Sequence, residues 1–390
     1  MHHISPRRAA VALSAVLVGA ALPLVVAPAP ALAAEPCTSE ASPLPLVPGC
    51  DDAAAPTTTI TGADPSVSTK WIRQDSVAIS FTGAHTDGDT DPLGYECQFD
   101  TPTKPPSDWE GCTSPARFTG LDEWTEGAQY TFRVRAVDTA DNAIDLVSPI
   151  FGGTDTPDYD ESPAAVQFRV DTTAPTTFGT LRSNYYDEDR QDVPMVTSPT
   201  VQIRLFGGEA APGADAPVYQ CRLNDQRVAC NDGITTLAGL GAGMQRFTAA
   251  AVDPAGNVDP TPFEQRFFVP RDLNVTDATR ASRDAWRNVR GPSSFAGDYL
   301  ETTTYGATLT FRVNSIRAIR LLAPSGPGLG KVQVRVGRGG WTTVNLASSD
   351  TQRLRVYQVR DELSGMVAGP LQIRVASKNK PVRVDAVMAR

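Results

Sequence analysis

Alternating apolar and polar residues run through most of the chain. Residues 130–138 read YTFRVRAVD and residues 77–81 read VAISF, so apolar side chains stand at every second position. A period of two is typical of a β-strand with one buried face. The same criterion predicts strands at residues 165–170 and 263–269, and the sequence DPAGN at 253–257 predicts a tight turn before the last of them.

One set of landmarks occurs twice in the same order. It consists of Tyr-x-Cys, a second cysteine, Gly-Leu, a strand ending in Ala-Val-Asp, and a turn with Ala-x-Asn. The first copy has them at 95–97, Cys112, 120–121, 136–138 and 140–142, and the second at 219–221, Cys230, 239–240, 251–253 and 255–257. One module is therefore used twice, with insertions that we expect in loops.

These landmarks resemble those of the bacterial Ig-like repeats of secreted and surface proteins, which are common in actinobacteria. The linker VDTTAP at residues 170–175 belongs to the same pattern. The resemblance covers about residues 56 to 270. It implies two β-sandwiches that act as spacers or adhesin stalks, and it carries over no catalytic residue.

Residues 271–390 contain no cysteine but show further strands. Apolar residues alternate at 307–313, 332–336, 371–375 and 382–384, and Gly337 to Gly340 predict a turn. With GATLTF at 306–311 and VDAV at 384–387, this segment resembles the galactose-binding-like jelly-roll domains of secreted bacterial proteins. It is predicted to be a third sandwich.

The fold class that follows is all-β, with two Ig-like β-sandwiches followed by a jelly-roll-like β-sandwich. Many glycines and prolines, 31 and 32 respectively, agree with short strands joined by turns. The expected divisions are a signal peptide at 1–33, a linker at 34–55, Ig-like modules at 56–172 and 173–270, and the galactose-binding-like sandwich at 271–390.

The first 33 residues predict export. Arg7 and Arg8 precede an apolar stretch from Ala9 to Val26, and Ala31-Leu32-Ala33 matches a signal-peptidase site. No second apolar segment long enough to span a membrane follows. We therefore expect a secreted or cell-surface protein without a transmembrane segment after cleavage.

The six cysteines agree with an oxidising compartment. They form three neighbouring pairs, namely Cys37 with Cys50, Cys97 with Cys112, and Cys221 with Cys230. Six cysteines allow 15 connectivities, so this pairing is inferred from proximity and from the repeat. Spacings of 9 and 15 residues suit a bond between neighbouring strands, and a metal site is disfavoured because no Cys-x-x-Cys or nearby histidine is present.

Charge divides the chain at residue 270. Residues 34–270 hold 14 Lys and Arg against 35 Asp and Glu, a net of −21, while residues 271–390 hold 19 against 9, a net of +10. A basic terminal module on an acidic stalk favours binding of an anionic polymer such as teichoic acid or an acidic polysaccharide. The alternatives are a solvated surface, or docking of the basic module on its acidic neighbours.

Certain side chains of the third module are candidates for ligand contacts. Trp341, directly after the glycine turn, and Tyr299 can stack on sugar rings if they are exposed, as can Trp286 and Tyr305. The candidate cations, which alternate outward and are expected to form one face, are Arg312, Lys331, Arg335, Arg374 and Arg383. No nucleic-acid motif is present, so nucleic acid is not an expected partner.

Catalytic chemistry is poorly represented. After removal of residues 1–33, His85 is the remaining histidine, and its polar surroundings predict an exposed loop residue. A Ser-His-Asp triad or a multi-histidine metal site therefore depends on His85 alone. We expect no enzymatic activity, and an unrecognised hydrolase is the least favoured alternative.

Asp87, Asp89 and Asp91 make the same loop a candidate calcium site. Their alternation mimics the start of an EF-hand loop, although Pro92 and Gln98 stand where that loop needs Gly and Glu. The hypothesis is a looser, structural calcium site, and solvated acidic loops are the alternative. We expect no other cofactor.

Together these features predict a non-catalytic extracellular protein. The Ig-like modules would act as spacers, and the terminal sandwich would bind carbohydrate or an anionic cell-wall polymer. The competing hypothesis is a purely structural accessory protein without a specific ligand, or an accessory part of a polysaccharide-active system.

Overall fold

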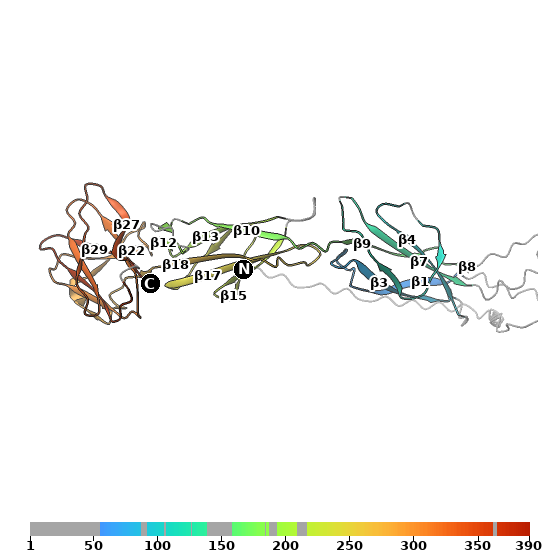
Figure 1. Ribbon diagram of the computed structural model, residues 1–390, viewed down its shortest axis with the longest axis horizontal. Helices are drawn as coiled ribbons and strands as arrows, with labels where there is room; N and C mark the ends of the chain where they lie inside the picture. The colour runs from blue at the N-terminus through green and yellow to red at the C-terminus, as the bar shows by residue number, and fades with distance from the viewer. Residues whose placement is uncertain are drawn as a thin grey trace, which may run out of the picture.

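Three β-sandwiches lie in a row along the long axis of the molecule (Figure 1). This computed structural model describes residues 55–86, 92–104, 107–125, 127–138, 158–183, 185–186, 193–208, 217–361 and 365–390. The predicted all-β class, two Ig-like sandwiches followed by a jelly-roll-like one, is confirmed by the strands and their pairing.

The first sandwich consists of two facing sheets. One has the order β1-β3-β6, and the other β2-β9-β7-β4-β5, with β8 paired to β7. Aromatic rings from both sheets fill the space between them, among them Phe81, Phe132 and Phe168. The strands are β1 (Thr57–Asp64), β2 (Trp71–Ile72), β3 (Ser76–Ala84), β4 (Gly94–Asp100), β5 (Glu110–Gly111), β6 (Ala116–Thr119), β7 (Tyr130–Asp138), β8 (Asp158–Tyr159) and β9 (Ala164–Val170).

The second sandwich repeats this topology. Its sheets have the orders β10-β13-β16 and β11-β12-β18-β17-β14-β15, and the short β12 pairs in parallel with β18 as β2 does with β9. The strands are β10 (Thr176–Leu181), β11 (Tyr185–Tyr186), β12 (Met195–Val196), β13 (Val201–Gly208), β14 (Val218–Leu223), β15 (Gln226–Val228), β16 (Gly233–Leu237), β17 (Gly243–Val252) and β18 (Phe263–Val269).

The duplication extends to single hydrogen bonds. Ala136 N donates to Thr58 Oγ1 at 2.7 Å in the first sandwich, and Ala251 N donates to Thr177 Oγ1 at 2.8 Å in the second. These bonds satisfy backbone groups where the two sheets meet, so both copies need a hydroxyl at this position. The repeat deduced from sequence landmarks is thus a structural repeat.

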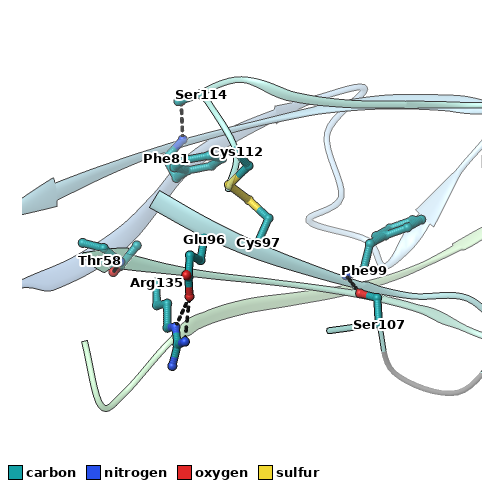
Figure 2. Close-up of a disulfide and its surroundings, with 10 residues drawn as sticks. Thr58, Phe81, Glu96, Cys97, Phe99, Ser107, Cys112, Ser114 and Arg135 are labelled. Atoms are coloured by element: carbon teal, nitrogen blue, oxygen red, sulfur yellow. Dashed lines mark hydrogen bonds and ion pairs between the residues drawn. A yellow bond between two sulfur atoms is a disulfide. The ribbon is translucent and has the colours of Figure 1, made fainter. Parts of the chain in front are cut away.

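Two of the three predicted disulfides are present. Cys97–Cys112 joins β4 to the residue after β5, and Cys221–Cys230 joins β14 to the segment after β15, with Cα atoms 5.8 and 6.1 Å apart. Figure 2 shows the first of them beside the Glu96–Arg135 ion pair. Cys37 and Cys50 lie outside the described residues.

The third sandwich has a five-stranded sheet, β20-β23-β28-β25-β26, opposite sheets β19-β30-β24-β27 and β21-β22-β29. Its elements are β19 (Arg271–Asp272), β20 (Arg280–Ala281), the 3-10 helix η2 (Arg283–Ala285), β21 (Arg287–Arg290), β22 (Asp298–Thr302), β23 (Thr308–Phe311), β24 (Ile319–Ser325), β25 (Lys331–Val336), β26 (Thr342–Asn345), β27 (Gln352–Arg360), β28 (Leu371–Val375), β29 (Val382–Val384) and β30 (Ala386–Ala389).

Strand β24 is buried on both faces. Leu321 belongs to the core of the third sandwich, while Leu322 belongs to the core cluster of the second, together with Phe268, Met388 and Phe295. The third sandwich therefore packs against the end of the second through apolar side chains. Docking on the neighbouring module does occur, by hydrophobic burial rather than by charge.

The junction of the first two sandwiches is polar. Asn257 Nδ2 donates to the carbonyl of Asp171 at 2.7 Å, and Arg73 Nη1 donates to the carbonyl of Gly256 at 3.5 Å. Glu123 accepts hydrogen bonds from the backbone of Thr172 and Thr173 in the linker. Burial, followed by the nearby charge of Asp253, raises the pKa of Asp171 to about 6.

Candidate functional site

The five candidate cations of the third sandwich do not form one face. Arg335 on β25 and Arg374 on β28 project from the five-stranded sheet, whereas Arg383 on β29 projects from the opposite one, where Tyr299 stands on β22. Their strand neighbours on either side are buried in the core between the sheets. The two sets of side chains therefore point away from each other, and the sequence-based expectation of one basic face is wrong.

The indole ring of Trp341 contacts both Arg335 and Arg374. Its ring centroid lies 4.3 Å from Cζ of Arg335 and 4.2 Å from Cζ of Arg374, while the residue itself is half-buried. The turn before Trp341 requires glycine at position 337, because a Cβ on Gly337 would lie 2.4 Å from the carbonyl oxygen of Ala368. Stacking of guanidinium groups on an indole contributes about 0.5–2 kcal/mol each, and it fixes two cations at one spot.

Two glutamines hold these arginines. In the register of β25 and β28, Gln333 stands opposite Arg374 and Arg335 opposite Gln372. Arg374 Nη2 donates to Gln333 Oε1 at 2.6 Å, and Arg335 Nε donates to Gln372 Oε1 at 2.5 Å. The side-chain amides thus orient both guanidinium groups without neutralising their charge.

A hollow of about 540 Å³ opens beside this cluster, between the glycine turn and β27. Arg335, Gly339 and Gly340 line one side of it, and Gln358 and Asp361 line the other. Sites of this size suit a small molecule or a segment of a polymer. We call Trp341, Arg335, Arg374, Gln333 and Gln372, with this hollow, the Trp341 face.

The charge of Arg383, on the opposite sheet, is neutralised by an ion pair within the protein. Arg383 Nε lies 2.7 Å from Oε2 of Glu301, and Arg287 pairs with the other oxygen of the same carboxylate. Burial acts to raise the pKa of Glu301, but hydrogen bonds from Arg287 and Arg383 outweigh it and lower the pKa. Arg383, whose Cζ lies 5.3 Å from the Tyr299 ring, therefore compensates a buried charge.

The other candidates are dispersed. Lys331 is exposed on the same sheet as Arg335, and Arg312 lines a separate cleft of about 500 Å³ between the second and third sandwiches. Trp286 is a core residue at 6% exposure, whereas Tyr305 is 59% exposed, near Lys378. Among these candidate aromatic residues, Trp341 is the one whose ring contacts two guanidinium groups.

Two carboxyl groups of the third sandwich, one fully buried and one half-buried, have raised pKa values. Asp385, between β29 and β30, is fully buried and accepts a hydrogen bond from the backbone of Phe295. Burial, outweighing that bond, raises its pKa to about 7. Burial and the charge of Asp298 raise the pKa of the neighbouring Asp272 to about 6. These groups make the stability of the third sandwich depend on pH.

His85 is not the exposed residue that the sequence predicts. Its side chain is 9% exposed, and its Nδ1 lies 3.1 Å from Oδ2 of Asp138. The two residues meet because β3 and β7 pack against each other across the sandwich, so that their ends lie close together. A sequence-based view of the polar run around His85 could not locate Asp138.

Metal binding gains no support from the described part of the chain. Asp87, Asp89 and Asp91, the candidate calcium ligands, lie outside the described residues. Within those residues, no group of three or more His, Cys, Asp or Glu side chains is placed to hold a metal ion. Asp160, which lies with Asp158 and Glu161 in a second acidic stretch of the sequence, is buried and accepts a hydrogen bond from Ser162 N.

No family model matches this sequence, and no curated protein matches it either. Among solved structures, the chain is similar to a β-1,3-glucan binding CBM6 from Bacillus halodurans, at 13% identity and a TM-score of 0.24, over 31% of this chain and 95% of that one. It is also similar to CsCBM6-3 from Clostridium stercorarium in complex with cellobiose, at 14% identity and a TM-score of 0.23, over 30% and 91%.

A further similarity spans more of the chain. Fibronectin(III)-like modules of CbhA from Clostridium thermocellum match over 55% of this chain and 94% of that one, at 11% identity and a TM-score of 0.31. In the described residues, no helix is long and apolar enough to cross a membrane.

Proposed function

We propose that this chain is a non-catalytic extracellular protein that binds an anionic carbohydrate polymer through the Trp341 face. The two Ig-like modules serve as spacers that hold the third sandwich away from a surface. The proposal includes export through residues 1–33 and the domain boundaries given above. The two disulfides are compatible with an oxidising compartment.

The observation that carries the proposal is the contact of Trp341 with two guanidinium groups that are held by neutral amides. Arg335 and Arg374 keep their charge, because their side-chain partners Gln333 and Gln372 are uncharged. An acidic sugar chain offers carboxylate or phosphate oxygens to such groups and hydroxyls to the amides. The net charge of +10 over residues 271–390 strengthens attraction of a polyanion from a distance.

Binding of the purified full chain to polygalacturonate, teichoic acid and an uncharged polysaccharide, at low and high salt, tests this function. We expect salt-sensitive binding of an acidic polymer, and we expect the double variant Arg335→Gln, Arg374→Gln to weaken it about tenfold or more, equivalent to about 1.4 kcal/mol. Trp341→Ala should have a similar effect, because it frees both guanidinium groups.

The matched control removes the same charge elsewhere on the third sandwich. Arg283 and Arg290 are both exposed. Arg283 follows β20, which β23 separates from β28 in the five-stranded sheet, and Arg290 ends β21 of another sheet, so Arg283→Gln, Arg290→Gln should leave most of the binding intact. Equal losses in both double variants would show that net charge, rather than the Trp341 face, binds the polymer. No binding of any polymer at low salt would refute the function.

The alternative is a structural accessory protein without a specific ligand. One observation favours it: Leu322, Ala386 and Met388 of the third sandwich share a buried cluster with Phe268 of the second. A module that is fixed on its neighbour can serve as a rigid end cap. The binding experiment separates the alternatives, since an end cap binds none of the polymers.

A further inference from the structure

The second sandwich exposes a pair of stacked aromatic rings on its three-stranded sheet. Phe178 on β10 and Phe206 on β13 are directly opposite in the strand register, and their ring centroids lie 5.6 Å apart at an interplanar angle of 20°. Their exposures are 51% and 43%, far above those of the core phenylalanines. Ile234 on β16, at 54% exposure, lies diagonally across from Phe206.

Strand alternation explains why the rings face outward. Thr177 and Leu205, the neighbours of Phe178 and Phe206, are buried on the inner side of the sheet. Thr177 is fixed there by its bond to Ala251 N, so β10 cannot turn Phe178 inward without losing that bond. The rings are therefore held in solvent by the register of the strands.

The first sandwich provides an internal comparison. Thr57 Oγ1 donates to the carbonyl of Ala84 in the first copy, as Thr176 Oγ1 does to that of Gly208 in the second. Two residues further along, Thr59 stands opposite Thr82 where the second copy has Phe178 opposite Phe206. Both threonines are exposed.

The module thus folds with threonines at these two positions. Phenylalanine in solvent forfeits hydrophobic stabilisation that an inward position would provide, so packing does not account for the exposed pair. Of the two Ig-like modules, the second has aromatic rings at these positions and the first has threonines, which points to a ligand of the second module.

The apolar area of the pair and the polar side chains around it favour a small ring-shaped ligand over a protein. A phenylalanine buries roughly 150–250 Å², so two half-exposed rings and Ile234 offer on the order of 300 Å² of apolar area. A stable protein interface needs about 800 Å² from each partner. The surrounding outward side chains are hydrogen-bonding groups, namely Thr180, Gln202, Arg204 and Thr236.

Charge points to an uncharged ligand. Residues 173–270 hold 7 Lys and Arg against 11 Asp and Glu, a net of −4, and Arg204 is the cation nearest the pair on this sheet. A polyanion finds little electrostatic attraction on this face. The apolar faces of neutral sugar rings can stack on the aromatic rings, and their hydroxyls can form hydrogen bonds with the surrounding polar side chains.

We propose that Phe178 and Phe206 form a second binding site, which takes an uncharged saccharide chain by stacking of its rings. This site is independent of the Trp341 face, so the chain would bind a neutral and an acidic polysaccharide with different modules. Two sites on one chain would raise its retention on a mixed polysaccharide surface through effective concentration.

Calorimetric titration of the full chain with neutral oligosaccharides of glucose, xylose and mannose tests the site. We expect binding of at least one of them that is insensitive to salt. The double variant Phe178→Thr, Phe206→Thr, which copies the pair of the first sandwich, should weaken it about tenfold or more. Its thermal unfolding midpoint should stay close to that of the original chain, because both side chains are exposed.

Two controls make the result specific. Trp341→Ala should leave neutral binding unchanged, so a failure of the Trp341 face and a failure of this site are distinguishable. Thr59→Phe, Thr82→Phe should add a weak second neutral site in the first sandwich. The proposal is overturned if no neutral oligosaccharide binds, if the double threonine variant binds equally well, or if the pair instead drives self-association that this variant abolishes.

Discussion

At the scale of single residues, burial raises the pKa of one carboxyl group of the third sandwich, that of Asp385. Asp385 is fully buried beside Asp272, and its pKa is about 7 against 3.8 in an unfolded chain. A carboxyl group with a raised pKa favours the folded state when it is protonated. Its contribution is fully present at low pH and is lost as the pH rises from about 4 to about 7.

The third sandwich should therefore be less stable at neutral pH than at mildly acidic pH. Asp385→Asn keeps an oxygen that accepts the hydrogen bond from Phe295 N and removes the titration. We expect this variant to gain on the order of 2 kcal/mol at neutral pH and little at acidic pH. Urea unfolding as a function of pH measures it, and an unchanged pH profile in the variant would contradict the assignment.

At the scale of elements, each Ig-like module carries one disulfide at the same place. Cys97–Cys112 and Cys221–Cys230 close short loops at the end of the sheet where the edge strands β5 and β15 pair over only a few residues. Two or three residues of pairing give little stability to an edge strand. The bond holds the edge strand on its neighbour instead.

Removal of one bond should destabilise its own module. For Cys97→Ser, Cys112→Ser we expect a loss of about 3 kcal/mol, the loop entropy of a 15-residue closure, in the unfolding of the first sandwich. The matched change is Cys221→Ser, Cys230→Ser, which should act on the second sandwich. Differential scanning calorimetry follows the separate transitions, and a loss in both modules from one variant would contradict independent bonds.

At the scale of the whole molecule, the two junctions differ in kind. The first is a polar contact around Asn257 and the linker carbonyl of Asp171, whereas the second buries Leu322 and Met388 against Phe268. An apolar junction with a buried cluster fixes the relative placement of two modules more firmly than a few hydrogen bonds. The second and third sandwiches therefore behave as one unit.

Loss of the apolar contact should separate the last two sandwiches. We expect Leu322→Ala to split their joint thermal transition into two. Leu321→Ala, which creates a cavity in the core of the third sandwich, should lower the free energy of unfolding of that sandwich by about 2–5 kcal/mol. Calorimetry and small-angle X-ray scattering measure both effects. A single, unsplit transition in the Leu322 variant would show that Leu322 is not needed for the coupling of the two sandwiches.

Sequence patterns were enough to predict the all-β class, the duplicated module, the two described disulfides and most strands with one solvent-facing side. Each of these follows from a local pattern, because alternation and repeated landmarks can be recognised in one segment without knowing which strand pairs with it. Strand β24 was missed for the same reason, because a strand buried on both faces does not alternate.

Which outward side chains contact one another could be known from the three-dimensional structure alone. It separated Arg383 from Arg335 and Arg374, buried His85 against Asp138, and placed the exposed Phe178 beside Phe206. The physical reason is that pairing between strands distant in sequence sets these neighbours, and register between sheets is not encoded in the period of any one strand. The position of a binding site on a β-sandwich therefore depends on strand pairing, which the sequence of a single strand does not encode.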